Sequence, residues 1–405
     1  MQNGNAHDRI LLLDDDPFQL KVLTRQLSNL GLGHVETYST GRDVLERLDE
    51  QNGGGVLLFL DLNMPEMDGV EFIRYLATRS CACALVLLSG EDERILHTAA
   101  KLARARGLNV LAHLQKPILL EALRAVVARW RSHTAEIYRG PRRSYSPDEI
   151  RRAILGGELV NFYQPQIEIA TGAVAGVETL VRWQHPEDGL VYPDQFVGAA
   201  EECGLIDDLT SVVLATAVDQ AKRWRDGGMP LRVAVNVSMD NLVRLDFADF
   251  VFAQIAQTGL DPSDLILEVT ESRLMTDPLA ALDILTRLSL KHVGLSIDDF
   301  GTGHSSLAQL RDIPFTELKI DRVFVHRAGE NKTLHAIFES SLGMARGLSI
   351  TAVAEGVEDI EDWNFLCAHE CDIAQGYFAA KPMPPEALPV WLAEWEGRRV
   401  GIVSQ

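Results

Sequence analysis

The chain has 405 residues, of which 46% are hydrophobic, so it is long enough for two or three domains with packed cores. Its formal net charge of −20 and pI near 5.0 would repel a polyanion such as DNA, and no basic helix-turn-helix-like segment offsets that charge. A small anionic ligand would therefore have to be held by divalent cations and local donors.

Cysteine usage and hydropathy indicate the compartment. The five cysteines are odd in number and scattered: Cys81, Cys83, Cys203, Cys367 and Cys371. The two close pairs lack a companion Cys/His pair at zinc-finger spacing, so reduced thiols are favoured over zinc ligands. No apolar run reaches the roughly 18 residues that span a bilayer, and residues 1–8 lack a signal-peptide core. We expect a soluble, cytoplasmic protein that does not contact membranes.

Apolar runs alternate with amphipathic stretches from residue 10 to about residue 127. Strands are predicted at 10–13, 34–38, 56–60, 85–88 and 110–114. Five successive βα units predict a doubly wound, flavodoxin-like parallel sheet with its site at the carboxyl ends of the strands.

Four of these strands end at polar residues that can bind a metal or a phosphoryl group: Asp14, Asp15 and Asp16, then Asp61, Ser89 and Lys116. Three carboxylates, a hydroxyl and an ammonium group suit Mg²⁺-assisted phosphoryl transfer to a carboxylate, and Asp61 follows the central strand. The alternative is helix capping, which we accept for Asp16 because Pro17 follows it. Asp14 and Asp15 then remain for the metal.

This segment resembles a response-regulator receiver domain over about residues 8–130. The shared motifs, in the family's order and spacing, are Leu-Leu-Leu-Asp14-Asp15, Asp61-Leu-Asn-Met-Pro65-Glu-Met-Asp-Gly69, Ser89 and Lys116-Pro117. The resemblance implies that Asp61 accepts a phosphoryl group from a histidine kinase, that Asp14 and Asp15 bind Mg²⁺, and that Ser89 and Lys116 act as switch residues. The chain departs from the family at His113, where an aromatic switch residue is usual, which puts the usual ring rotation in question.

The segment after the receiver-like region is rich in Arg, Ser and Pro and has no apolar period. We predict domains at 1–132 and 147–405, joined by a linker at 133–146. The second domain has the usual length of a (β/α)₈, TIM-like barrel. Helices are predicted at 193–202, 209–226, 279–289, 332–346 and 360–369.

In this second domain, seven short apolar runs end at polar residues: Glu178, Asn236, Glu268, Asp298 with Asp299, Lys319, Glu355 and Gln375. Catalytic groups of such barrels lie where the strands end. The hard oxygen ligands suit Mg²⁺ or Mn²⁺, in a two-ion arrangement that could hydrolyse a phosphodiester. Helix caps or surface charges are the alternative for any single acid, but their succession at strand ends favours a site.

The second domain resembles the EAL family of cyclic-di-GMP phosphodiesterases over about residues 148–395. The matching motifs are Tyr163-Gln164-Pro165, Glu178-Thr-Leu-Val-Arg182-Trp, Asn236-Val-Ser238, Glu268-Val-Thr-Glu271, Asp298-Asp-Phe-Gly-Thr-Gly303, Leu318-Lys319-Ile-Asp321, Ala354-Glu355-Gly-Val-Glu358 and Gln375-Gly376-Tyr377.

The resemblance implies a role for each matching residue. The implied metal ligands are Glu178, Asn236, Glu268, Asp298 and Asp299, joined by Asp321. Lys319 and Glu355 would be catalytic: Lys319 would orient or polarise the nucleophilic water, and Glu355 would bind the second metal or act as base. Gln164, Arg182 and Gln375 would contact substrate, and Glu271 would anchor the loop at 299–305. The chain departs from the family at Thr179, which replaces an alanine and removes no ligand, and at His304, which replaces a tyrosine. We interpret His304 as a loop-packing residue rather than a catalyst, because no triad partner is evident.

Together these features predict a two-component response regulator, a homo-oligomer that hydrolyses cyclic-di-GMP to linear pGpG. The reaction would need Mg²⁺ or Mn²⁺, with two ions in the barrel and Mg²⁺ in the receiver, and phosphorylation of Asp61 would regulate it. One alternative is a barrel that binds cyclic-di-GMP without cleaving it. A DNA-binding response regulator is a second alternative, which the acidic charge disfavours.

Overall fold

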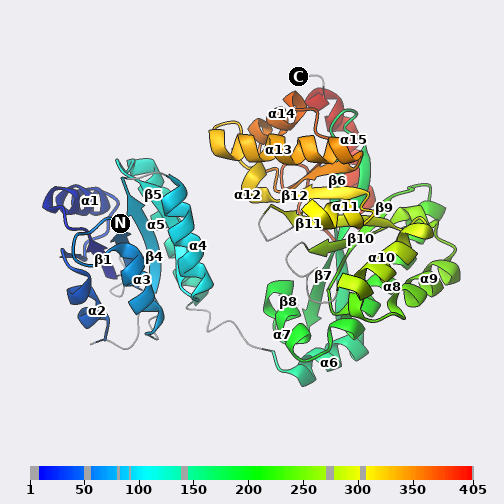
Figure 1. Cartoon of the computed structure of the whole chain (residues 1–405), viewed down its shortest axis with the longest axis horizontal. Helices are drawn as coiled ribbons and strands as arrows, with labels where there is room; N and C mark the ends of the chain where they lie inside the picture. Colours follow the sequence, from blue (N-terminus) through cyan, green and yellow to red (C-terminus); the bar gives the residue numbers. More distant parts are fainter. Residues whose placement is uncertain are drawn as a thin grey trace. The chain divides into compact units, whose positions relative to one another are not determined.

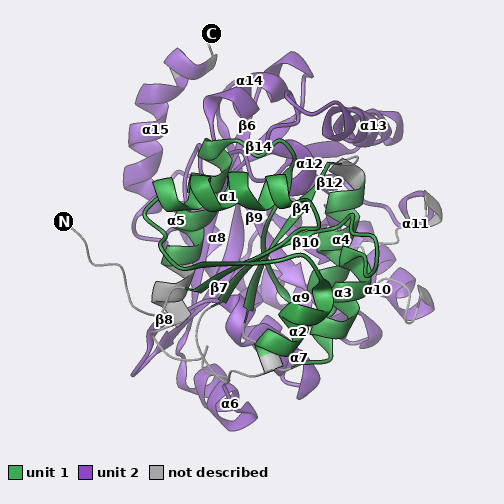
Figure 2. Cartoon of the chain, turned by 90° about the vertical axis from the view of Figure 1, so that its left-hand side faces the viewer, with its two compact units in different colours: residues 1–143 green, residues 144–405 purple. Residues whose placement is uncertain are grey.

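The computed structural model describes residues 9–49, 56–79, 83–90, 93–137, 145–270, 278–301 and 307–403. The chain divides into two compact units, residues 1–143 and 144–405 (Figures 1 and 2). Among the described residues, each unit has hydrophobic clusters of its own, two in the first and one in the second.

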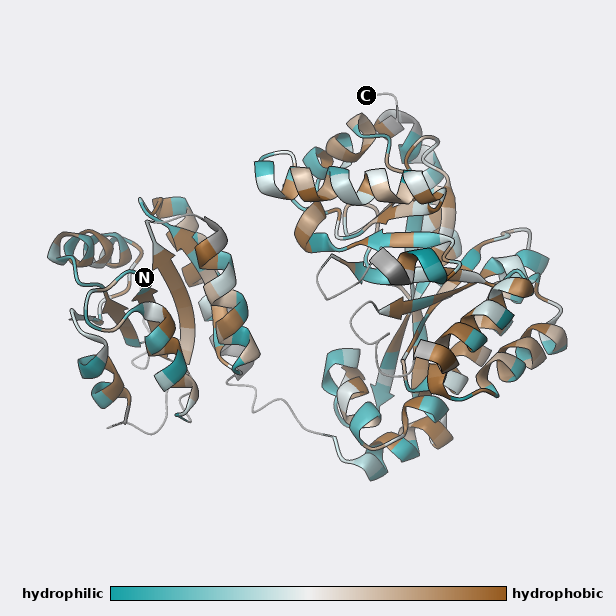
Figure 3. Ribbon diagram, in the orientation of Figure 1, coloured by the Kyte–Doolittle hydropathy of each residue, from teal (hydrophilic) through white to brown (hydrophobic). Residues whose placement is uncertain are grey.

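The first unit is a parallel five-stranded sheet in the order β2-β1-β3-β4-β5. Its strands are β1 (Arg9–Leu13), β2 (Val35–Tyr38), β3 (Val56–Asp61), β4 (Cys83–Ser89) and β5 (Asn109–Gln115). The central strands β3 and β4 are buried throughout, as strands covered on both faces must be, and β4 is hydrophobic in Figure 3. The predicted doubly wound, flavodoxin-like fold is confirmed.

Helices cover both faces of this sheet. They are α1 (Pro17–Asn29), α2 (Gly41–Asp49), α3 (Gly69–Ala77), α4 (Glu93–Ala105) and α5 (Leu120–Ile137). Residues of α1 and α5 share one hydrophobic cluster, and residues of α2, α3 and α4 share the other. Helix α5 continues to Ile137, so residues 133–137 of the expected linker are helical. The next helix, α6 (Pro147–Gly156), begins with a capping box between Ser146 and Glu149.

The second unit is a closed barrel of eight strands with an extra hairpin strand, β8 (Gly189–Val191). Around the barrel the strands are β6 (Leu159–Glu168), β7 (Val174–His185), β9 (Arg232–Val237), β10 (Leu265–Thr270), β11 (Gly294–Phe300), β12 (Glu317–Ile320), β13 (Thr351–Ala354) and β14 (Ile373–Gln375), which returns to β6. The TIM-like barrel is confirmed, and the seven strands from β7 to β14 that carry the predicted polar residues are neighbours in chain order.

One strand departs from the parallel arrangement that we predicted. Strand β6 is antiparallel to both of its neighbours, β7 and β14. The physical reason is the connection at 169–173, which is far shorter than the dozen or so residues that a parallel crossover needs. The predicted Gln164 still lies beside the other predicted residues, because β6 pairs along its length with β7.

The helices of the second unit surround the barrel (Figure 1). After α6 they are α7 (Val197–Glu202), α8 (Ile206–Asp226), α9 (Phe247–Thr258), α10 (Pro278–Leu290), α11 (Leu307–Asp312), α12 (Arg322–Val325), α13 (Lys332–Leu348), α14 (Ile360–Ala368) and α15 (Leu388–Val403). Four of the five predicted helices are present as single helices. The fifth, at 193–202, is divided into a 3₁₀ turn (Pro193–Gln195) and α7, because Phe196 leaves the helical conformation at φ −136°.

Two further sequence expectations concern the thiols and the membrane. The described cysteines, Cys83, Cys203, Cys367 and Cys371, are free thiols, and Cys81 lies outside the described residues. Within the described ranges, the helices are all too short or too polar to traverse a lipid bilayer.

Candidate active site

Lys319 lies at the carboxyl end of β12 and is fully buried. Its Nζ is 2.7 Å from Glu355 Oε1, 3.0 Å from Glu268 Oε1, 3.4 Å from Asp298 Oδ1 and 3.7 Å from Glu178 Oε2. Burial lowers the pKa of Lys319, but the four carboxylates outweigh that effect and raise the pKa well above its usual value. The side chain is therefore a buried ammonium ion surrounded by acids on β7, β10 and β11 and directly after β13.

The acids around Lys319 exceed the positive charge that it supplies. Burial, helped by the neighbouring carboxylates, raises the pKa of Glu268 well above its usual value, that of Glu355 to about 8 and that of Asp299 to about 6. Both carboxylate oxygens of Glu268 are buried without an aligned hydrogen-bond donor in the described part of the chain, although Lys319 lies 3.0 Å away. Divalent cations would satisfy these oxygens, so the residues fit the metals predicted from the sequence.

Asp298 and Asp299 end β11 at a register shift. Asp299 has a left-handed backbone with φ 56°, and its N–H donates to Asp298 Oδ1 at 3.0 Å. This conformation brings oxygens of Asp298, Asp299 and Glu355 within 4.8 Å of one another, a spacing that could hold metal. Asp321 caps α12 by accepting from Val323 N, and it forms a side-chain hydrogen bond with Asp299. Asp321 is therefore linked to the other acids by its hydrogen bond with Asp299.

A chain of amides fixes the orientation of Glu178. Asn236 Nδ2 donates to Glu178 Oε1 at 3.0 Å, and Gln375 Nε2 donates to Glu178 Oε2 and to Gln164 Oε1. Gln166 Nε2 donates in turn to Gln375 Oε1 at 3.0 Å. Gln166 was not predicted, although its position two residues after Gln164 would place both side chains on the same face of a strand.

Two clefts open beside these residues and share Leu180. One, of about 290 Å³, is lined by residues that include Gln164, Glu178, Asp298, Arg322, Glu355, Gln375 and Tyr377. The other, of about 520 Å³, is lined by residues that include Thr179, Asn236 and Asp299. Neither Arg322 nor Tyr377 was assigned a role from the sequence, although Tyr377 belongs to the motif Gln375-Gly376-Tyr377 and Arg322 directly follows Asp321.

The arginine that the sequence assigned to substrate lies slightly apart. The Arg182 guanidinium is 4.9 Å from the ring centre of Tyr192 and 5.7 Å from that of Phe162, and it donates to Val181 O. Burial lowers its pKa, although an arginine remains charged. Glu271 and His304 lie outside the described residues.

The polar residues of the first unit also converge. Lys116 Nζ is 2.7 Å from Asp14 Oδ2 and 3.0 Å from Asp61 Oδ2, and oxygens of Asp14, Asp15 and Asp61 lie within 4.8 Å of one another. Burial raises the pKa of Asp61 although Lys116 opposes the shift. Ser89 is fully buried, and its carbonyl accepts from Lys116 N. The arrangement could hold a cation beside Asp61.

Two further residues of the first unit, Asp16 and His113, were singled out from the sequence. Asp16 caps α1 by accepting from Phe18 N, as its position before Pro17 predicted. His113, the departure from the receiver pattern, packs edge-on against His97 with ring centres 5.9 Å apart.

Replacing Thr179 by valine is expected to stabilise the protein by about 1 kcal/mol. Thr179 Oγ1 is buried with no hydrogen-bond partner in the described ranges, so removing the hydroxyl at constant volume removes a desolvation cost. Thermal melting of Thr179→Val beside Thr179→Ser, which keeps the hydroxyl, measures the effect. A lower Tm for the valine variant would show that the hydroxyl has a partner.

Without metal, the stability of the barrel is expected to fall as the pH rises from about 4.5 to about 8. The pKa values of Glu355 and Asp299 in the folded protein, about 8 and about 6, exceed their ordinary values of 4.5 and 3.8. The folded state thus binds more protons in this window, and the stability present below it is lost as the pH rises. Thermal melting in chelator from pH 5 to 9 tests this expectation. If the Tm of Glu355→Gln fell with pH as steeply as that of the wild type, Glu355 would not contribute to the effect.

Comparisons with known proteins agree with this geometry. The sequence model of the EAL domain matches residues 148–382, and that of the response regulator receiver domain matches residues 10–128. The cyclic di-GMP phosphodiesterase RocR of Pseudomonas aeruginosa is 33% identical over 380 residues, which is 93% of this chain and 96% of RocR.

A second relative is MucR of the same organism, a bifunctional diguanylate cyclase and cyclic di-GMP phosphodiesterase. It is 42% identical over 241 residues, covering 59% of this chain and 35% of MucR. The solved structure of its phosphodiesterase part in complex with c-di-GMP covers 60% of this chain and 98% of that one, with a TM-score of 0.57. The chain thus belongs to the EAL family, in a form that joins an EAL domain to a response-regulator receiver domain.

Proposed function

We propose that the barrel hydrolyses cyclic-di-GMP to linear pGpG with bound divalent cations, and that phosphorylation of Asp61 regulates the rate. The observation that carries the proposal is the buried Lys319 ammonium with four carboxylates between 2.7 and 3.7 Å from it. The cyclic di-GMP phosphodiesterase activities of the relatives RocR and MucR support cyclic-di-GMP as the substrate.

The cations would be held by Glu178, Asn236, Glu268, Asp298 and Asp299, with Asp321 orienting Asp299. Bound Mg²⁺ or Mn²⁺ would lower the pKa of water and stabilise the charge of the attacking and leaving oxygens. The orphaned oxygens of Glu268 and the close pair of Asp298 and Asp299 suit two ions.

Glu355 is the proton acceptor in this proposal. It lines the 290 Å³ cleft, and a pKa of about 8 without metal makes it a base suited to neutral pH. Lys319, whose Nζ is 2.7 Å from it, orients its carboxylate and balances developing negative charge. Gln164, Gln375 and Arg322 at the cleft would contact the nucleotide, with Arg182 beside them.

A binding module that does not cleave the nucleotide is the second candidate. Titration of cyclic-di-GMP in Ca²⁺ measures binding, and chromatography after incubation in Mg²⁺ or Mn²⁺ measures products. Formation of pGpG that chelator abolishes would support the enzyme. Tight binding with intact nucleotide under every metal condition would leave the binding module as the function.

Replacing Asp61 by asparagine is expected to abolish labelling of the protein by acetyl phosphate, because the amide cannot accept a phosphoryl group. Asp61 is buried beside Lys116 and the other two aspartates, whereas Asp43 is an exposed acid on α2. Intact-mass measurement should show one phosphoryl group on the wild type and on Asp43→Asn, and none on Asp61→Asn. Persistent labelling of Asp61→Asn would assign the acceptor elsewhere.

The partners follow from the same proposal. A histidine kinase would supply the phosphoryl group to Asp61, and the chain would act as a homo-oligomer. Light scattering before and after phosphorylation measures the oligomeric state. A monomer under both conditions would contradict the proposed homo-oligomer.

A further inference from the structure

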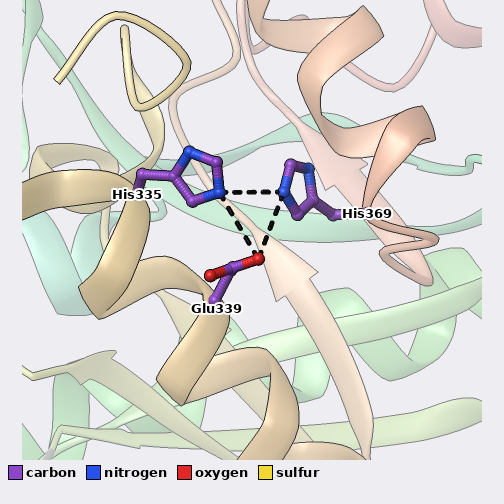
Figure 4. A group of neighbouring side chains, drawn as sticks. All are labelled: His335, Glu339 and His369. Atoms are coloured by element: carbon purple, nitrogen blue, oxygen red, sulfur yellow. Dashed lines mark hydrogen bonds and ion pairs between the residues drawn. The ribbon is translucent and has the colours of Figure 1, made fainter. Parts of the chain in front are cut away.

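A further cluster of side chains that could hold a metal lies on the helices outside the barrel (Figure 4). His335 and Glu339 extend from α13, and His369 follows the end of α14. His335 Nε2 is 3.1 Å from His369 Nε2 and 3.4 Å from Glu339 Oε1, and His369 Nε2 is 3.6 Å from Glu339 Oε1. None of the three lines either cleft described above.

The three separations match those between ligands of one metal ion. The two distances to the Glu339 oxygen, 3.4 and 3.6 Å, exceed those of good hydrogen bonds. The three atoms form a nearly equilateral triangle, whose centre lies about 2 Å from each corner because that distance is the side divided by √3. Zinc binds histidine nitrogen and carboxylate oxygen at about 2.0–2.2 Å.

The surroundings of His369 prepare its Nε2 as a ligand. Its Nδ1 lies 2.8 Å from Phe365 O, and only a protonated Nδ1 can donate to that carbonyl. In the neutral ring, Nε2 then carries the lone pair and faces His335. A backbone carbonyl that accepts from the second ring nitrogen is the usual support of a metal-binding histidine.

The helix supplies the remaining two ligands on one face. His335 and Glu339 are four residues apart, which places them one turn apart on the same side of α13. The rings of Phe365 and Phe338 pack around His369, with centres 4.2 and 6.0 Å from its own. The side chains are 37%, 57% and 20% exposed for His335, Glu339 and His369, so an ion could enter from solvent.

We propose that His335, Glu339 and His369 bind a zinc ion that joins α13 to α14. Two imidazoles and one carboxylate favour zinc over magnesium, which prefers oxygen ligands alone. Three protein ligands leave one position of a tetrahedral ion for water. The site is independent of the proposed catalytic metals because it shares no residue with them.

Zinc titration with Mg²⁺ in excess tests the proposal, with His369→Gln as the variant and His34→Gln, an exposed histidine of the receiver, as the control. The wild type and the control should bind one more equivalent of zinc than the variant, or bind that equivalent more than about tenfold more tightly. Zinc should also raise the Tm of the wild type more than that of the variant.

Glu339→Gln gives a second test that does not depend on the fold of His369→Gln, because Glu339 is mostly exposed. It should lose the same equivalent of zinc while its Tm without metal stays at the wild-type value. Equal zinc stoichiometry and affinity in the wild type and both variants would overturn the site and leave a hydrogen bond between the two histidines. Cyclic-di-GMP hydrolysis is not a readout here, so failure of this proposal is separate from failure of the proposed function.

Discussion

Replacing Glu355 by glutamine is expected to lower the turnover of cyclic-di-GMP by about 10²–10⁴-fold, the usual contribution of a general base. Glutamine keeps the shape of the side chain but cannot accept a proton. Glu355 Oε1 is 2.7 Å from Lys319 Nζ in the 290 Å³ cleft, and its pKa of about 8 suits proton transfer near neutral pH. Nucleotide binding should remain, because the amides and Arg322 at the cleft are unchanged.

Single-turnover kinetics and calorimetric binding on the same preparation separate these two effects. The matched control is Glu361→Gln, an exposed glutamate on α14 that should keep wild-type turnover. If Glu355→Gln turned over substrate at the wild-type rate, Glu355 would not be the base. If the variant lost binding and turnover equally, Glu355 would act in recognition or in metal binding instead.

Replacing Lys319 by methionine is expected to destabilise the metal-free barrel by about 3–5 kcal/mol, the cost of leaving buried charge uncompensated. Four carboxylates now surround the ammonium within 3.7 Å, and methionine would leave them facing one another. Protonation of Glu268 and Glu355, whose pKa values burial raises, would relieve part of the repulsion, so the loss should be larger at pH 8 than at pH 6. Denaturant unfolding in chelator measures it.

Divalent metal should offset much of that loss. Adding Mg²⁺ is therefore expected to raise the Tm of Lys319→Met more than that of the wild type. Lys291→Met, which removes an exposed lysine, serves as the control and should respond as the wild type does. A metal response of Lys319→Met no larger than that of the wild type would contradict the view that Lys319 and the cations share one group of carboxylates.

The strand-end pattern was enough to locate most of the candidate site. Glu178, Asn236, Glu268, Lys319 and Gln375 lie together because each terminates or lies within a strand whose neighbours in the barrel follow in chain order. Parallel neighbours bring their carboxyl ends to the same edge, so local patterns predicted a tertiary arrangement.

Features that depend on pairing between distant segments were not predictable in this way. An apolar run does not reveal its direction, so the antiparallel β6 was missed. Arg322 lines the cleft from the start of α12. Its position in the sequence did not distinguish it from an arginine exposed at the end of a surface helix. His335 and His369 are 34 residues apart on different helices, and only the packing of α13 against α14 brings them together.

Hydrolysis of cyclic-di-GMP in ¹⁸O-labelled water with Mg²⁺ or Mn²⁺ tests the central claim most directly. We expect linear pGpG that carries one ¹⁸O atom on its terminal phosphate, and about 10²–10⁴-fold less of it from Glu355→Gln in the same time. Intact cyclic-di-GMP, or pGpG without the label, would contradict attack by water at this carboxylate-lined site.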